Sequence, residues 1–133
     1  MTRVFRSKDA DHISKHGIDL TLYNENLSSL NVVKVHVEEG HFEEFYNKVS
    51  DFVYSIIGGY GTFVLDDEKH EVSSGDLVVA LAGTRIHYFG KMDMILSIAP
   101  AFNEADEVHV RFVEKTESPY YEAGNSNKST VTL

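Results

Sequence analysis

Residues 75–88 read GDLVVALAGTRIHY. The opening glycine and aspartate predict a tight turn, because glycine adopts backbone conformations that other residues avoid. The apolar run 77–82 then predicts a short buried strand, and Gly83 predicts a second turn before a strand that carries His87. Two glycine turns around one apolar strand indicate a small β-barrel with a pocket, and His87 is the first candidate for a residue in that pocket.

Strand signals recur on both sides of this stretch, every ~8–12 residues, which is typical of an all-β sandwich or barrel. In 31–38, valines alternate with polar residues, so one face of the predicted strand is apolar. Residues 52–57 are rich in β-formers on both faces, which favours sheet packing or a subunit interface beside a pocket. Residues 66–69 predict a hairpin turn. Segment 41–48 stays open between a helix and an extended strand.

The composition limits the class of protein. The 133 residues are enough for one domain with its own core. No cysteine is present, which excludes disulfides and thiolate chemistry. The net charge of −9 argues against a nucleic-acid partner, because phosphate contacts need a basic surface. Neither an apolar run of membrane-spanning length nor a signal peptide is apparent, so we expect a cytoplasmic protein without a membrane partner.

The segment from about Val33 to Val113 resembles the cupin family of small β-barrels, over roughly three-fifths of the chain. The resemblance rests on glycines at the spacing of the two cupin motifs, which are Gly40, Gly59, Gly75 and Gly83. It implies one all-β, cupin-like barrel (a jelly roll) over 30–115. An N-terminal extension with an edge strand (1–29) and a flexible C-terminal tail (116–133) would flank the barrel. It also implies a homodimer, since cupins commonly pair through their sheets.

The usual cupin metal site is not in register in this chain. Three histidines and one glutamate hold a divalent metal in that site, and the counted positions here carry other residues: Tyr46, Lys48, Phe52 and Ile86. A β-bulge would shift the register by one residue and turn His87 and Asp51 inward, with Glu44 as a third donor. A divalent metal on Glu44, Asp51 and His87 therefore depends on such a bulge.

A looser resemblance is to the ectoine-synthase-like cupins. It rests on His87-Tyr88, on Ala99-Pro100 and on the later Glu107-Val108-His109. This resemblance implies a place for His87 in acid–base chemistry.

The candidate site residues follow from the barrel register. His87 is the expected catalytic residue, as a general base or a metal ligand. Four side chains would orient a substrate, with Arg85 pairing with an anionic group: Tyr46, Lys48, Tyr54 and Arg85. For each of them a structural or solvated side chain is the competing interpretation. His41, between Gly40 and two glutamates, is interpreted as a loop histidine.

Three functions remain open, and the sequence does not decide whether the chain is an enzyme. One of them is a structural or assembly partner whose barrel is filled by side chains and has no pocket, and the other two use a pocket. One is an isomerase, lyase or cyclase that acts on a small polar metabolite in the barrel pocket. The alternative is a metal-free cupin that binds or senses a small ligand without catalysis, as the displaced metal ligands suggest.

Overall fold

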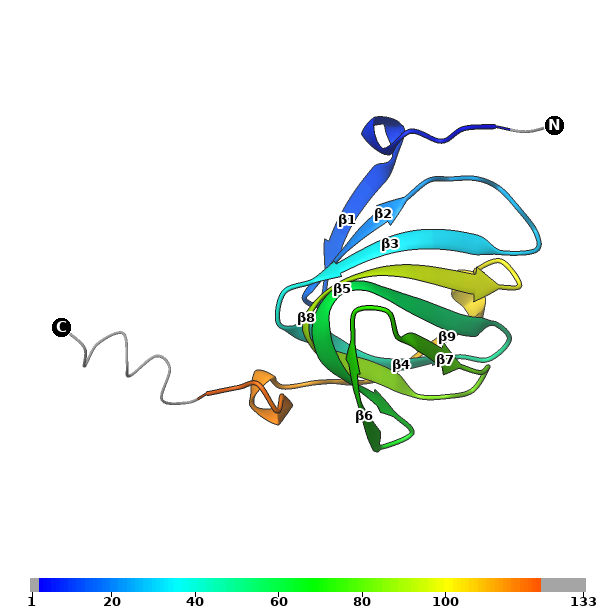
Figure 1. Ribbon diagram of the computed structural model, residues 1–133. Helices are drawn as coiled ribbons and strands as arrows, with labels where there is room; N and C mark the ends of the chain where they lie inside the picture. Colours follow the sequence, from blue (N-terminus) through cyan, green and yellow to red (C-terminus); the bar gives the residue numbers. More distant parts are fainter. Residues whose placement is uncertain (1–2, 123–133) are drawn as a thin grey trace.

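The computed structural model describes residues 3–122 and is built almost entirely of strands (Figure 1). Within that range nine strands and three short 3-10 turns follow one another. The strands are β1 (Asp11–Lys15), β2 (Ile18–Leu22), β3 (Asn31–Val37), β4 (Gly40–Asn47), β5 (Asp51–Leu65), β6 (Glu68–Ser73), β7 (Leu77–Ala80), β8 (Ile86–Ala99) and β9 (Glu107–Phe112), and the turns are η1 (Ser7–Asp9), η2 (Glu104–Asp106) and η3 (Lys115–Glu117). The expected all-β, cupin-like barrel is confirmed.

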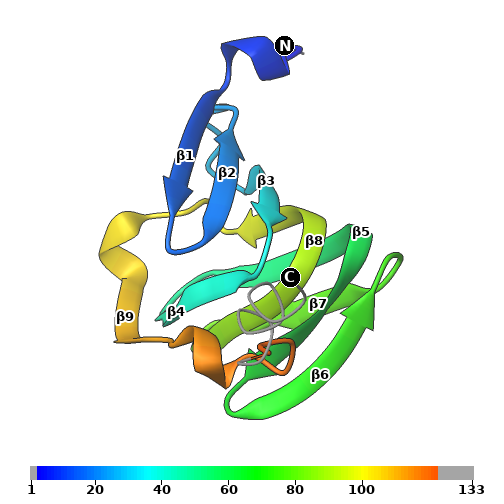
Figure 2. The ribbon, with the colours of Figure 1, turned by 90° about the vertical axis from the view of Figure 1, so that its left-hand side faces the viewer.

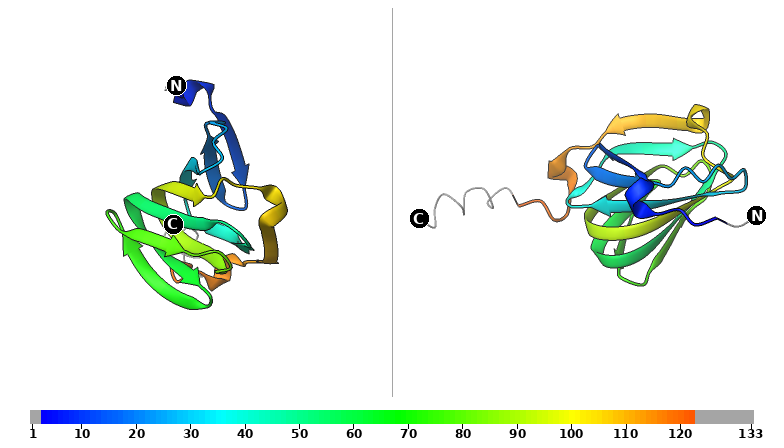
Figure 3. Two further views of the ribbon diagram at one scale, coloured as in Figure 1. Left: turned by 90° about the vertical axis from the view of Figure 1, so that its right-hand side faces the viewer. Right: turned by 90° about the horizontal axis from the view of Figure 1, so that it is seen from above.

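Two long, bent strands connect the layers of the barrel. β5 pairs with β8 along nearly its whole length, from Asp51↔Ala99 to Leu65↔Ile86. The order β1-β2-β3-β8-β4-β9 continues on one side, while β6 and β7 pair with β5 on the other. The sheet therefore curls on itself, as Figures 2 and 3 show from the side and from above.

The interior is lined by the alternate side chains that the sequence pattern predicts. On β3, Val33, Val35 and Val37 are buried, while Lys34 is exposed. The inward residues of the other strands join the same core: Phe52, Tyr54, Ile56, Phe63, Tyr88, Met92, Met94, Leu96 and Ile98. The period-2 pattern thus places the core inside the curled sheet.

The glycine turns around β7 lie where the sequence places them. Gly75 and Gly83 have φ values of 98° and 88°, in the left-handed region that favours glycine. The hairpin between β5 and β6 also forms, with Asp66 and Asp67 at positive φ. Segment 41–48, which the sequence left open, is extended: residues 41–47 belong to strand β4, and Lys48 follows it.

The two flanks of the barrel pack on it. Strands β1 and β2 form a hairpin that extends the sheet through the pairing of β2 with β3. After β9, residues 113–122 lie against the outer face, where the Tyr120 hydroxyl is 2.9 Å from Thr62 Oγ1. The expected flexible tail, 116–133, falls outside the described residues from 123 onward. In residues 3–122, no helix has the length and apolar character needed to cross a membrane.

Candidate functional site

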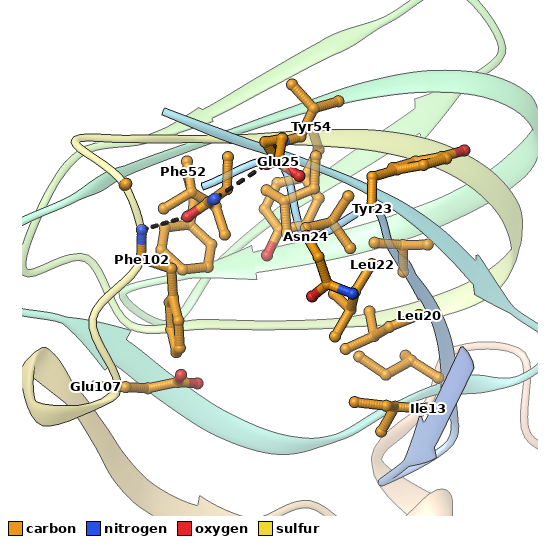
Figure 4. A pocket seen from close by; sticks show the side chains of 18 of the residues that line it. Ile13, Leu20, Leu22, Tyr23, Asn24, Glu25, Phe52, Tyr54, Phe102 and Glu107 are labelled. Carbon is orange, nitrogen blue, oxygen red and sulfur yellow. Dashed lines mark hydrogen bonds between the residues drawn. The ribbon is translucent and has the colours of Figure 1, made fainter. Parts of the chain in front are cut away.

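A cavity of about 510 Å³ opens inside the curled sheet. Its walls are mostly apolar, and Figure 4 shows Ile13, Leu20 and Leu22 on one side, with Phe102 and Glu107 on another. A few polar side chains reach the cavity among these apolar residues: Lys15, Tyr23, Asn24, Glu25, Asn26, Asn31, His41, Tyr54, Tyr88 and Glu107. An apolar cavity with a few convergent polar groups is the usual form of a small-molecule site.

His41, at the start of β4, is the buried histidine of this cavity. It is 4% exposed, and its ring lies beside those of Tyr88 and Phe45, with centroids 5.2 Å and 5.4 Å away. Among the described residues, neither ring nitrogen has a hydrogen-bond partner. Burial lowers the pKa of His41 to about 3, so the ring is neutral near pH 7.

Two tyrosines line the cavity beside His41. Tyr54 on β5 and Tyr88 on β8 are both 1% exposed, and their rings meet edge to face with centroids 5.7 Å apart. Burial raises the pKa of both phenols, so each keeps its proton near neutral pH. Buried phenols of this kind donate hydrogen bonds and can hold a substrate hydroxyl or carbonyl oxygen.

A carboxylate and an ammonium group also line the cavity. Glu107 opens β9, and burial raises its pKa, while the charge of Lys15 at the end of β1 acts in the opposite direction. Together with His41 they give the cavity a base, a carboxyl group and a cation on separate strands.

The remaining polar lining belongs to a hydrogen-bonded frame around Asn31. The Asn31 side chain accepts from the Phe102 amide at 2.5 Å and donates to Glu25 Oε1 at 3.0 Å, as the dashed lines in Figure 4 mark. The Val32 amide donates to the same Glu25 oxygen. This frame ties the loop after β2 to the loop after β8, so both lie at fixed positions on the cavity wall.

His87, the expected catalytic residue, does not line this cavity. It alternates with Ile86 and Tyr88 on β8 and so points to the outer face, where its ring lies 5.5 Å from that of Phe89. No bulge after Gly83 turns it inward. Burial lowers the pKa of His87, while the nearby Glu44 carboxylate acts to raise it. Its Nδ1 lies 3.5 Å from Glu44 Oε2, close enough for an ion pair but without an aligned hydrogen bond.

Glu44 is the centre of an ionic network on that outer face. The Glu44 side chain is only 2% exposed, and its two oxygens accept from Arg85 Nη1 at 3.3 Å and from Arg111 Nε at 3.1 Å. Arg85 also makes a two-point contact with Asp67, and Arg111 makes one with Glu117. The network connects β4, β8, β9 and η3, so Arg85 and His87 have structural partners and lie away from the cavity.

The other expected substrate and metal residues are dispersed. Tyr46 pairs with Val108 in the sheet, and Lys48 is exposed at the end of β4. Asp51 accepts a hydrogen bond from the Ala82 amide at 2.8 Å. Of the predicted substrate residues only Tyr54 lines the cavity.

The donor set does not fit the divalent metal that the cupin fold commonly holds. The Glu44 and His87 side chains approach each other, but both oxygens of Glu44 already accept hydrogen bonds from Arg85 and Arg111. Asp51 does not join them and instead accepts a hydrogen bond from the Ala82 amide. In residues 3–122, no group of three or more His, Asp or Glu side chains is arranged to hold a metal ion. We therefore derive no chemical step through a metal.

Sequence reasoning missed His41 and Tyr88. The count from Gly40 placed the site five residues further along β4, whereas His41 directly follows that glycine. The register of β4 against β8 shifts between His41 and Phe45, but both of these residues line the cavity, so alternation along β4 directs Tyr46 away from it. The interpretation of His41 as a loop histidine is wrong. Tyr88 was present in the quoted His87-Tyr88 pair, and strand alternation around His87 would have pointed it inward.

Comparison with solved structures identifies similar proteins. The nucleoside dehydratase Pac13 from Streptomyces is 46% identical, with a TM-score of 0.88, and the match covers 90% of this chain and 100% of that one. An RmlC-like cupin from Shewanella frigidimarina is 14% identical, with a TM-score of 0.65 over 78% of this chain and 96% of its own. KdgF from Halomonas sp. is 19% identical, with a TM-score of 0.68 over 79% and 99%. No family model and no curated protein sequence matches the chain.

Three further Pac13 structures hold uridine, each in a variant with one replaced side chain. One variant replaces a histidine with glutamine and two replace a tyrosine with phenylalanine. From the histidine to the first tyrosine is 13 positions, and from there to the second is 34. The same intervals separate His41, Tyr54 and Tyr88. The three buried polar residues of this cavity therefore correspond in type and spacing to those three positions.

Proposed function

This chain belongs to the same family as Pac13, within the cupin superfamily, and from that premise we propose that it is a lyase that removes water from a nucleoside. One observation carries the proposal: His41, Tyr54 and Tyr88 line a single cavity and match the positions varied in the uridine-bound Pac13 structures. Isomerase and cyclase activities, which the sequence also left open, have no comparable support.

Elimination of water needs a base, a proton donor and a site that orients the leaving hydroxyl. His41 is neutral and buried, and neither ring nitrogen has a hydrogen-bond partner among the described residues, so the ring is placed to take a proton from a carbon of the sugar. The C–H electron pair becomes the new double bond, and the neighbouring C–O bond breaks. The proton on His41 then passes to the departing oxygen, which leaves as water, and the ring returns to its neutral form.

The two phenols fit the supporting role. Tyr54 and Tyr88 keep their protons, so each can donate to an oxygen of the sugar and hold the reacting carbon near His41. The apolar walls exclude water around these groups, which strengthens each hydrogen bond. Glu107 and Lys15 supply further polar contacts for a molecule rich in hydroxyl groups.

Titration calorimetry separates this proposal from the alternative of a metal-free binding protein. We expect uridine to bind more tightly than ribose or uracil alone, since the cavity has both polar groups and an extended apolar wall. Chromatography of the same mixtures then looks for turnover across a panel of nucleosides. Binding without turnover of any nucleoside supports the binding module, and the absence of nucleoside binding contradicts the proposed nucleoside lyase.

A homodimer is part of the proposal as well. On β7, Leu77 and Val79 are 62% and 49% exposed, and Ile57 on the neighbouring β5 is 59% exposed. These outward apolar side chains form a face on the outside of the barrel that a second copy would cover. Sedimentation velocity is the test: we expect a dimer for the native chain and a monomer for Val79→Glu.

A further inference from the structure

Glu43 lies between the cavity histidine and the protein surface. Its Oε1 is 3.8 Å from His41 Nε2 and 3.9 Å from His16 Nε2, and its Oε2 accepts a 2.7 Å hydrogen bond from His109 Nδ1. The exposure of these side chains rises outward, from 5% for His41 and 13% for Glu43 to 44% for His109. One carboxylate thus contacts the buried ring on one side and a surface histidine on the other.

Local structure holds this arrangement in place. The Phe42 amide donates to the His16 carbonyl at 2.8 Å, which fixes the β1–β2 turn against β4. Phe112 packs on the rings of both His16 and His109, with centroids 5.6 Å and 4.5 Å away. The proposed reaction does not otherwise use Glu43, and it does not line the cavity.

The chemistry of His41 calls for a neighbouring anion. A buried imidazole accepts a proton from carbon only if the resulting positive charge is stabilised, and burial acts against that charge. Several ionisable groups lie around His41: Lys15 and His16 from the β1–β2 hairpin, Glu43 from β4, Tyr54 from β5, Tyr88 from β8 and Glu107 from β9. His87, on the other face of β8, acts on the ring through its charge, and His109 contacts Glu43. The charges of His16, Lys15 and His87 oppose a positive charge on the ring, and a carboxylate close to the ring is the group suited to offset them.

We infer that Glu43 is a positioning residue for the proposed reaction, a carboxylate that orients His41 and stabilises the imidazolium formed when the ring accepts a proton. This inference rests on the proposed function. The distance of 3.8 Å is longer than a hydrogen bond, and such contacts commonly tighten when a substrate enters. His109 holds the other oxygen of Glu43 and so aims the carboxylate toward the cavity. The arrangement matches the carboxylate–histidine pairs in which the carboxylate orients the ring and stabilises its charged form.

The test compares Glu43→Gln with the native protein and with Glu71→Gln, an exposed carboxylate on β6 distant from the cavity. NMR titration of labelled histidine follows the ring of His41 with and without uridine. In the native protein and in Glu71→Gln we expect uridine to raise the pKa of His41. In Glu43→Gln we expect no such rise, and kcat lower by ~10- to 100-fold with the acid limb of its pH profile displaced.

A second variant covers the case in which Glu43→Gln does not fold. His109→Gln removes the surface support of Glu43, and we expect a smaller loss of kcat in the same direction, with the affinity for uridine within ~3-fold. If His41 titrates alike in Glu43→Gln and the native protein, or if their kcat profiles coincide, the role of Glu43 is overturned. If no protein turns over any nucleoside, the proposed function fails, while the titration still decides whether Glu43 and His41 are coupled.

Discussion

His41 and Tyr88 are directly paired across the β4–β8 ladder, with their rings tilted by 46° and their centroids 5.2 Å apart, and both side chains line the cavity. The pair joins a neutral base to a protonated phenol in one apolar space. Alternation along each strand directs His87 and Glu44 to the outer face, where they take part in the ionic network instead of lining the cavity. The site predictions below follow from this division between inner and outer faces.

Replacement of His41 by glutamine removes the base but retains a polar side chain of similar reach. We expect kcat to fall by ~100- to 10,000-fold, the range that a positioned general base supplies. Uridine should still bind, because the tyrosines and the apolar walls remain. Parallel calorimetry and turnover assays make the comparison, and a His41→Gln protein with native kcat would contradict the assignment.

The phenols are tested by Tyr54→Phe and Tyr88→Phe. Each change deletes one hydroxyl and keeps the ring that packs in the core, so we expect the fold to persist. Turnover should fall by ~10- to 100-fold in each, as expected when a hydrogen bond to the reacting oxygen is lost. Tyr60→Phe on the outer surface is the matched control. Equal turnover in all three variants would exclude a role for the buried hydroxyls.

Burial of His41 makes the stability of the protein depend on pH. The unfolded chain takes up a proton on this ring near pH 6.5, whereas the folded chain does so only at about pH 3. The free energy of unfolding therefore decreases as pH falls from about 6.5 toward 3, by as much as ~1.4 kcal/mol per pH unit from this group. Urea denaturation between pH 7 and pH 4 measures the slope.

In His41→Gln we expect the free energy of unfolding to change less steeply with pH. Glutamine does not take up a proton, so the difference of up to one proton between the unfolded and folded states at position 41 is lost. His70→Gln on β6, where the side chain is 44% exposed, is the control and should follow the native curve. If His41→Gln also followed the native curve, His41 would not be the buried neutral histidine that the structure describes.

The ionic network on the outer face should contribute to the free energy of unfolding and not to turnover. Glu44→Gln leaves Arg85 and Arg111 without their shared buried carboxylate, and we expect the free energy of unfolding to drop by about 1–3 kcal/mol. The partly exposed arginines remain solvated, which limits the loss.

Replacement of His87 tests whether the outer face of β8 contributes to stability and not to turnover. His87→Gln should lower the melting temperature while kcat stays within ~2-fold of native, because its ring lies outside the cavity. A large loss of kcat in a folded His87→Gln protein would restore the catalytic role that the sequence predicted for it.

The sequence predicted the fold well, because local signals were consistent with it. The alternation at Val33, Val35 and Val37 and the turns at Gly75 and Gly83 depend on side-chain period and backbone freedom, which a single chain reveals.

The site was predicted less well, because its position depends on pairing between strands. Which residues of β4 face the cavity is set by how that strand pairs with β8, and no local motif indicates that pairing. Counting along the chain therefore led to Tyr46 and Lys48, while the buried histidine was the residue next to Gly40. Tyr54 was a candidate because it lies on the strand predicted over 52–57, but both faces of that strand carry bulky residues, so the sequence alone did not decide whether Tyr54 or Ser55 faces the pocket.

The most direct test of the central claim is mass spectrometry of nucleosides incubated with the purified protein. The panel contains uridine and nucleosides with and without a carbonyl group on the sugar, since a neighbouring carbonyl makes a C–H bond acidic enough for elimination. We predict that the native protein converts at least one of them to a product lighter by one water, and that His41→Gln does not. Unchanged mass of every nucleoside with the native protein, or equal conversion by His41→Gln, would contradict the account.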